Sequence, residues 1–424
     1  MKIKIFQSTY DQVMALKQDK PFRPVRPNMF FRTLKYLISQ FMVVPSHFKY
    51  ESYNMDKLDP KEPCLILMNH SSFIDLALAE HIFYPRPINI ICTSDAFVGK
   101  HWLMRQIGCV PTHKFVTSSR LIHQIRDLFN KHKSSVLIYP EAGYTFDGTC
   151  TTLPESLGAM IKLLRRPVVI VTTHGAFARD PLYNNIQVRK VDVCAEVTYA
   201  LTPEDIKAMS TDEVNAVIKK HFSFDNFRWQ QDNKIRIDEP FRADYLNRVL
   251  YKCPNCGHEG AMEGKGTDLS CGHCGKQWTL DEYGYLRAKD GVHIFDHVPD
   301  WYAWEREMVR RDILEGKYGM DLNVDICAMV NNKKLYRIGT GRLVHNREGF
   351  ELTGCDGKLH YSQKPMASYS LNADFNWYEI GDVICIGDDK ILYYCFPNNA
   401  GDFVAKARLA TEEMYKIAKA ESRR

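Results

Sequence analysis

The segment Cys64–Asp75, which reads Cys-Leu-Ile-Leu-Met-Asn-His-Ser-Ser-Phe-Ile-Asp, decides the fold that we expect for this chain. Its apolar beginning predicts a short buried strand, and the polar residues that follow predict a turn into a helix. His70 therefore lies at the carboxyl end of a strand, where open α/β sheets place their ligands. Asp75 falls in the first turn of the helix, from where its carboxylate can reach the imidazole.

This His–Asp pair has two interpretations. A carboxylate that fixes the tautomer of a histidine and stabilises its imidazolium makes that histidine a general base. Ser72 and Asp75 also have the spacing of a capping box, which needs no chemistry. Spacing alone leaves both interpretations open.

Outward from this segment, strand-like and helix-like stretches alternate from residue 64 to about residue 222. This alternation is typical of an α/β domain with a mostly parallel sheet flanked by helices. The predicted strands are Cys64–Met68, Ile88–Cys92, Cys109–Thr112, Ser135–Tyr139, Pro167–Thr172 and Arg189–Tyr199. The predicted helices are Phe73–Phe83, Ser118–Lys131, Glu155–Leu164 and Pro203–Phe222.

The whole chain divides into five predicted parts. They are a membrane-associated α/β domain (1–225), a bridge (226–250), a cysteine-rich module (251–282), a connecting helical segment (283–321) and a β-rich accessory domain (322–424). The connecting segment carries Trp301, Tyr302 and Trp304, which we interpret as interdomain core rather than as membrane anchors. The last part combines short β-like runs with one amphipathic helix, which predicts a small barrel plugged by a helix, similar in shape to a pleckstrin-homology domain.

Four of the 13 cysteines form two Cys-x-x-Cys pairs, each followed by glycine: Cys253, Cys256, Cys271 and Cys274. Four thiolates at this spacing are typical of a zinc ribbon, in which the ion is structural and has no open coordination position. The remaining nine cysteines are scattered, and an odd total cannot pair completely within one chain. Reduced thiols beside a metal site indicate a cytoplasmic protein.

Charge and hydropathy restrict the partners. The net charge of +5 and the absence of a basic stripe near the cysteine pairs argue against nucleic acid, whereas a mild positive charge suits an anionic membrane surface. The longest run without a charged residue, Tyr36–Phe48, has 13 residues, and a spanning helix needs about 20. The first residues lack the apolar core of a signal peptide. We therefore expect a cytoplasmic protein bound peripherally to the membrane.

The segment Met29–Val44 is the candidate membrane contact. It carries apolar residues at helical spacing, and Arg32 and Lys35 are its only charges. Such a helix can lie in the bilayer interface with its two cations extending toward anionic headgroups. A helix packed into the core of the first domain fits the same pattern. The five expected anchors are Phe30, Leu34, Leu37, Ile38 and Phe41.

Four blocks of sequence resemble one family. Asn69-His70-Ser-Ser-Phe-Ile-Asp75 resembles the NHx4D signature of glycerolipid acyltransferases, the family of bacterial 1-acylglycerol-3-phosphate acyltransferase. The later blocks follow in the family's order and cover, with the first, about residues 28–222. Gly108-Cys-Val-Pro-Thr-His-Lys114 is similar to GxxPxxR, Tyr139-Pro-Glu-Ala-Gly-Tyr-Thr145 to FPEGTRS, and Arg166–Val171 to a fourth block in which a proline opens a buried strand.

The resemblance implies transfer of a fatty acyl group from acyl-CoA or acyl-carrier protein to a hydroxyl of a lysophospholipid or related glycerolipid. His70 would be the general base, and Asp75 would orient it. Glu141 and Gly143 would bind the acceptor headgroup, and Lys114 its phosphate. The implied fold is an acyltransferase-type α/β domain.

Two positions depart from the family pattern. Lys114 stands where the second block has an arginine, and a lysine offers no bidentate fork. Tyr144, in the substrate-binding third block, also replaces an arginine. Weaker phosphate binding leaves lysophospholipids, other glycerol or sugar lipids and amino-lipids as acceptors. The alternative function is a non-catalytic lipid-binding or scaffold protein that retains the fold.

Overall fold

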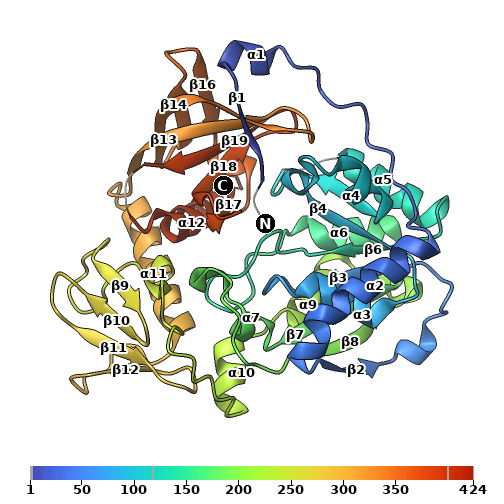
Figure 1. Ribbon diagram of the computed structural model, residues 1–424, viewed down its shortest axis with the longest axis horizontal. Coiled ribbons are helices and arrows are strands. Elements are labelled where there is room, and N and C mark those ends of the chain that lie inside the picture. Colours follow the sequence, from blue (N-terminus) through green and yellow to red (C-terminus); the bar gives the residue numbers. More distant parts are fainter. Residues whose placement is uncertain (1–2, 117–118, 399–400, 424) are drawn as a thin grey trace.

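Three β-sheets organise the computed structural model, which describes residues 3–116, 119–398 and 401–423 (Figure 1). The α/β domain lies to the right in this view. The sheet of the cysteine-rich module lies at the lower left, and the C-terminal sheet lies above it.

The first sheet has seven strands in the order β2-β8-β7-β3-β6-β4-β5. All neighbours are parallel except β7 and β8, so the predicted mostly parallel sheet is confirmed. The predicted strand from Arg189 begins only at Cys194. The strands are β2 (Lys49–Tyr53), β3 (Leu65–Met68), β4 (Ile88–Thr93), β5 (Cys109–Thr112), β6 (Ser135–Ile138), β7 (Val168–His174) and β8 (Cys194–Leu201).

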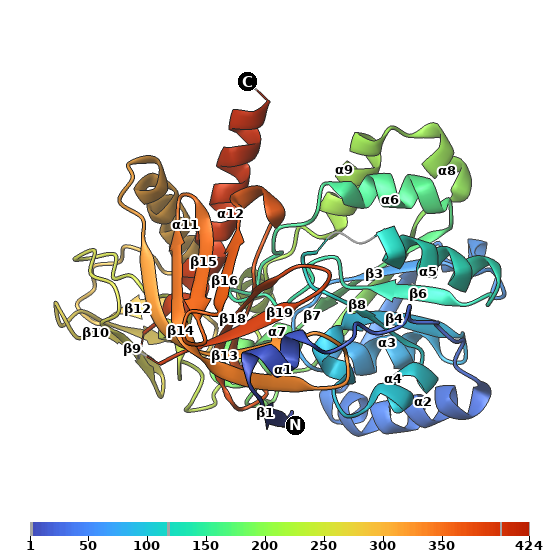
Figure 2. The same cartoon turned by 90° about the horizontal axis from the view of Figure 1, so that it is seen from above.

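Helices cover both faces of this sheet because β3 is apolar on both sides. Ile66 and Met68 pack with α3, whereas Leu65 and Leu67 pack with α5, α6 and α9. Figure 2 shows α2, α3 and α4 on one side and α6, α8 and α9 on the other. The helices are α2 (Met29–Val43), α3 (Asp75–Phe83), α4 (His101–Gln106), α5 (Ser119–Asn130), α6 (Ser156–Leu164), α7 (Ala176–Arg179), α8 (Pro203–Ala208) and α9 (Thr211–His221).

The single helix expected over 203–222 is two, because Ser210 accepts a hydrogen bond from the backbone of Glu213 and caps a new helix there. Ser118, the expected start of another helix, lies outside the described residues. No helix in the described part of the chain has both the length and the apolar character needed to cross a bilayer.

The cysteine-rich module is a four-stranded antiparallel sheet, β12-β11-β10-β9. The expected bridge before it is partly ordered into α10 (Asn226–Asp232). After the module, α11 (Val298–Leu314) buries Trp301 and Tyr302, which agrees with their interpretation as interdomain core. The strands are β9 (Met262–Lys265), β10 (Asp268–Cys271), β11 (Gln277–Leu280) and β12 (Leu286–Ala288).

The C-terminal sheet joins two antiparallel meanders, β13–β16 and β17–β19, through the pair β13–β19. Among the described residues β16 and β17 do not pair, so the expected barrel is an open, curved sheet packed against α12. Its strands and helix are β13 (Met320–Met329), β14 (Leu335–Asn346), β15 (Gly349–Gly354), β16 (Leu359–Gln363), β17 (Asn372–Trp377), β18 (Gly381–Gly387), β19 (Leu392–Pro397) and α12 (Phe403–Ser422).

The N-terminus departs from the expected division at residue 225. Strand β1 (Ile5–Gln7) pairs in parallel with β14, and helix α1 (Tyr10–Met14) follows it. The chain thus starts in the C-terminal sheet and then crosses to the α/β domain. One continuous core, which includes Phe146, Trp278 and Leu409, joins the α/β domain, the cysteine-rich module and the C-terminal part.

Candidate active site and cysteine cluster

His70 and Asp75 meet at the carboxyl end of β3. The distance between His70 Nδ1 and Asp75 Oδ2 is 3.1 Å, and the Asp75 carboxylate is fully buried. The same Oδ2 accepts the backbone N–H groups of Ser71 (2.7 Å) and Ser72 (2.9 Å). Because Asp75 Oδ2 is a hydrogen-bond acceptor for these two N–H groups, we expect it to accept from His70 Nδ1 as well. The imidazole proton then lies on Nδ1, and Nε2 is free to accept a proton.

The capping interpretation of Ser72 is only half right. Its N–H donates to Asp75, but its hydroxyl donates to the buried carboxylate of Asp180 and does not accept the backbone N–H of Asp75. The turn is thus held by two acids, of which the sequence had indicated one.

Burial sets the protonation of this pair. The imidazole of His70 is stacked on the ring of Tyr139 at 4.1 Å and is tilted against that of Tyr144 at 4.2 Å, both measured between centroids. Desolvation, assisted by the charge of Lys114, lowers the pKa of His70 to about 3. Burial raises the pKa of Asp75, and its two backbone N–H donors act against this. Burial therefore favours the neutral form of the His70 imidazole.

Glu141 has a different position from the one expected for a headgroup ligand. Its carboxylate is fully buried and accepts two backbone N–H groups, from His70 (2.7 Å) and from Thr151 (2.9 Å). Burial raises its pKa to about 7. Thr145 completes the contact by donating its N–H to the carbonyl of His70 (3.1 Å). In this arrangement the loop 139–146 holds the backbone of His70.

Gly143 and Tyr144 belong to the same loop. The left-handed backbone conformation occurs at Ala142 (φ 54°), not at Gly143. Gly143 instead lies against another side chain, because a Cβ there would come 2.9 Å from Nη2 of Arg408. Tyr144 contributes its ring to the wall around His70 and its carbonyl to Arg408.

Lys114 follows β5 in a loop that contacts the C-terminal sheet. His113 Nδ1 lies 2.9 Å from the carbonyl oxygen of Asp388, and the ring of Phe115 packs against Tyr369. The charge of Lys114 acts on His70 and also lowers the pKa of Asp374 in β17 against the stronger effect of burial. The C-terminal part therefore borders the candidate site.

The residues that this part supplies were not predicted from the sequence. Arg408 of α12 and Asp374 of β17 lie more than 200 residues from the motifs that they approach, and no local pattern indicates them. Asp180 was also missed, although it directly follows the short helix α7.

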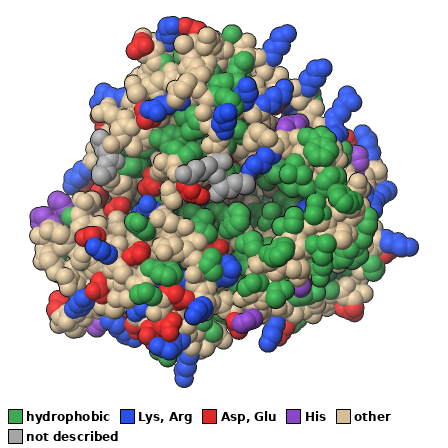
Figure 3. Space-filling model, in the orientation of Figure 1, with side chains coloured by type: hydrophobic (Ala, Val, Ile, Leu, Met, Phe, Trp, Pro, Cys, Tyr) green, Lys and Arg blue, Asp and Glu red, His purple; other side chains and the backbone are tan. Residues whose placement is uncertain are grey.

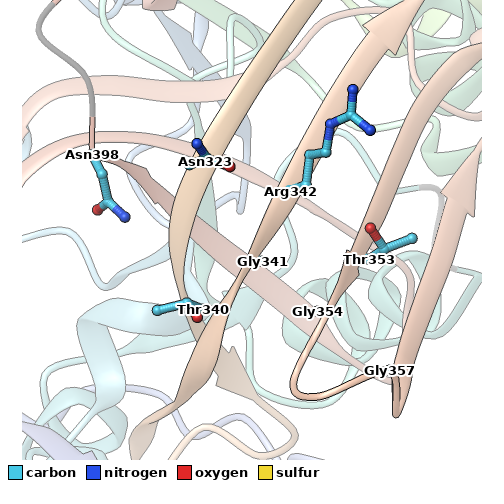
Figure 4. Close-up of a pocket in the computed structure, with 8 residues that line it drawn as sticks. All are labelled: Asn323, Thr340, Gly341, Arg342, Thr353, Gly354, Gly357 and Asn398. Carbon is cyan, nitrogen blue, oxygen red and sulfur yellow. The ribbon is translucent and has the colours of Figure 1, made fainter.

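A groove of about 610 Å³ on the C-terminal sheet does not belong to this site. Figure 4 shows its lining, which is Asn323, Thr340, Gly341, Arg342, Thr353, Gly354, Gly357 and Asn398. Arg342, its one charged residue, is already paired with Asp321. None of the predicted site residues lines this groove.

Helix α2 turns its apolar side outward. Phe30 is 67% exposed, Ile38 58% and Phe41 82%, and only Leu34 of the five expected anchors is not exposed. Figure 3 shows apolar side chains gathered over the region of α2, α3 and α4. We call this surface the apolar face; its exposed members are Met29, Phe30, Leu37, Ile38, Phe41, Val44, Phe73, Leu76, Trp102 and Leu103.

The polar side of α2 faces the protein. Arg32 donates to the carbonyl of Pro85 (2.6 Å), and Lys35 pairs with Glu80 (2.5 Å). The expected extension of these cations toward headgroups is therefore wrong, because both anchor α2 to α3 and the turn after it. A helix with polar contacts inside and apolar residues outside has the reverse of the usual surface pattern.

The four clustered cysteines come together as predicted. Their Sγ atoms all lie within 4.8 Å of one another, with Cys253–Cys274 at 3.7 Å and Cys256–Cys271 at 3.8 Å. Zn–S bonds of about 2.3 Å in a tetrahedron give S···S distances of about 3.8 Å. The cluster can thus hold a metal ion, and its geometry fits zinc.

We expect one zinc ion per chain in protein prepared without chelator, as measured by elemental analysis. Cys271→Ser should reduce the bound zinc and lower the melting temperature, because a structural site loses a buried ligand. Cys150→Ser, at a cysteine outside the cluster, is the control. Wild-type protein that contains no zinc, or a Cys271→Ser variant that melts at the wild-type temperature, contradicts the assignment.

Comparisons with known proteins found one matching family and a similar solved structure. Residues 49–174 match the model of the Acyltransferase family. A solved structure of the 1-acyl-sn-glycerophosphate (LPA) acyltransferase PlsC from Thermotoga maritima is similar over 45% of this chain and 78% of that chain, with 12% identity and a TM-score of 0.37. No curated protein sequence matches significantly. Residues 49–174, which contain His70 and Asp75, thus match an Acyltransferase domain, and a four-cysteine module and a β-rich C-terminal part follow them in the chain.

Proposed function

We propose that this protein transfers a fatty acyl group from a thioester, acyl-CoA or acyl-carrier protein, to a hydroxyl of a lysophospholipid or related glycerolipid. The observation that carries the proposal is the His70–Asp75 pair, in which His70 Nδ1 lies 3.1 Å from the buried carboxylate of Asp75. The family match of residues 49–174 supports the reaction class.

In the proposed reaction, Nε2 of His70 removes the proton of the acceptor hydroxyl. The hydroxyl oxygen attacks the thioester carbonyl carbon, and the carbon–sulfur bond then breaks. The imidazolium returns the proton to the leaving thiolate, so that a free thiol and an ester result. Asp75 stabilises the imidazolium while it exists.

The acceptor site has few charges available to bind a phosphate. Lys114 supplies a cation near His70, whereas Tyr144 supplies only a ring. Glu141 is occupied by two backbone N–H groups, so its role is to hold His70. We therefore favour acceptors in which a hydroxyl and an acyl chain, rather than a free phosphate monoester, provide the recognition.

The membrane is the proposed source of the acceptor. The apolar face includes Phe73 and Leu76, which lie within six residues of His70 along the chain. Partial burial of Phe30, Leu37, Ile38 and Phe41 in a bilayer is worth about 4–8 kcal/mol before orientation costs. This is enough for reversible, peripheral binding.

We expect His70→Asn to lower the rate of transfer by about 10²–10⁴-fold, the contribution typical of a general base. Asn can still donate to Asp75, so the fold should persist. Asp75→Asn should cost less, because the imidazole remains. Thiol release with acyl-CoA and a panel of lysolipids, with the product identified by mass spectrometry, is the measurement.

The same domain offers a matched control for the base. His47 lies 2.8 Å from Asp192, but both side chains are more than 70% exposed. His47→Asn should retain full transfer. Wild-type turnover by His70→Asn would remove the mechanism, and lipid binding by the wild type without any turnover would favour the non-catalytic alternative.

Membrane binding has its own test. Replacing Phe30 and Phe41 with Ser should reduce flotation with anionic phosphatidylglycerol vesicles by at least fivefold, because both exposed rings are lost from the apolar face. Leu163→Ser with Val188→Ser removes two comparably exposed side chains outside this face. An equal loss of flotation in the two double variants, or no loss in either of them, contradicts a specific role for α2.

A further inference from the structure

The loop 139–146 controls the position of His70 from two sides. Its Glu141 carboxylate accepts the N–H of His70, and its Thr145 donates to the carbonyl of His70. Its Tyr139 and Tyr144 rings enclose the imidazole. Any displacement of this loop therefore moves the candidate base.

One side chain of the C-terminal helix holds this loop. Arg408 of α12 donates from Nη1 to the carbonyl of Tyr144 (3.0 Å), and its guanidinium lies 4.2 Å from the ring centroid of Phe146. Its Nη2 occupies the space beside Gly143 that a Cβ would need. Arg408 is only 4% exposed, so these contacts exclude water.

Arg408 is itself held in place by a buried ionic network. Glu412 lies one turn along α12, 4.0 Å from Arg408 Nε. Glu412 also binds Arg306 of α11 (2.6 Å) and accepts from the hydroxyl of Ser370 (2.7 Å). The guanidinium therefore approaches the loop from a rigid support formed by two helices.

We propose that Arg408 is a positioning residue of the acyltransferase site, which fixes the loop 139–146 and, through it, His70. The expected effect of Arg408 on kcat rests on the proposed function. Its effect on the position of the loop 139–146 does not. It assigns the C-terminal part a role in positioning the site, because Arg408 belongs to α12 and holds the loop that contacts His70.

The test is a double-mutant cycle. Gly143→Ala adds one methyl group at a position with ordinary backbone angles, and this methyl group collides with Arg408. Arg408→Leu removes the guanidinium but keeps apolar packing on Phe146. Each single variant should lower kcat at least tenfold, with KM for the thioester within threefold of the wild type. The double variant should be no more than twofold slower than Arg408→Leu, because the collision no longer exists.

The control is Arg310→Leu. Arg310 of α11 pairs with Glu413 of α12 at 3.0 Å, and among the described residues it forms no hydrogen bond or ion pair with the loop. This variant should keep wild-type kcat. Arg408→Lys, which keeps the charge, should recover part of the lost rate. Wild-type kcat in Gly143→Ala, or losses that multiply in the double variant, would overturn the proposal.

Hydrogen exchange separates this proposal from the proposed function. Amides of residues 139–151 should exchange at least tenfold faster in Arg408→Leu and in Gly143→Ala than in Arg310→Leu. If the wild type has no transfer activity but this exchange pattern holds, the proposed function fails while the positioning role stands. Unchanged exchange in both variants overturns the positioning role whatever the activity.

Discussion

Two buried carboxylates fix one histidine, and the rest of the structure maintains this constraint. Asp75 binds the side chain of His70 and Glu141 binds its backbone N–H. A buried carboxylate is stable only when hydrogen bonds replace its water. Both acids receive at least two backbone N–H groups, so the turn after β3 and the loop after β6 fit together in one arrangement.

The three sheets depend on each other around this site. The loop 139–146 belongs to the α/β domain, but Arg408 of α12 holds it from the C-terminal part. Helix α11 connects α12 to the cysteine-rich module, where Trp301 packs on Trp278 with 4.9 Å between ring centroids. The cysteine cluster thus belongs to a module that packs on α11, which in turn packs on α12.

The spacing of residues along the chain predicted those features that depend on residues close together in the sequence. The strand, turn and helix around His70 follow from Cys64–Asp75, and the cysteine cluster follows from its two paired repeats. The role of Glu141 could not be predicted, because the sequence does not show whether a carboxylate faces a substrate or a buried backbone. Arg408 was beyond prediction for another reason: its contact with Tyr144 spans 264 residues.

The most direct test of the central claim is the protonation of His70 itself. In protein labelled with ¹⁵N at histidine, and with the His70 signals assigned by comparison with His70→Asn, the imidazole should be protonated at Nδ1 and bare at Nε2. Because Nδ1 lies 3.1 Å from Asp75 Oδ2 and burial lowers the pKa of His70, the ring should be neutral at pH 7 with its proton on Nδ1. A proton on Nε2, or an imidazolium, at pH 7 would contradict an oriented base.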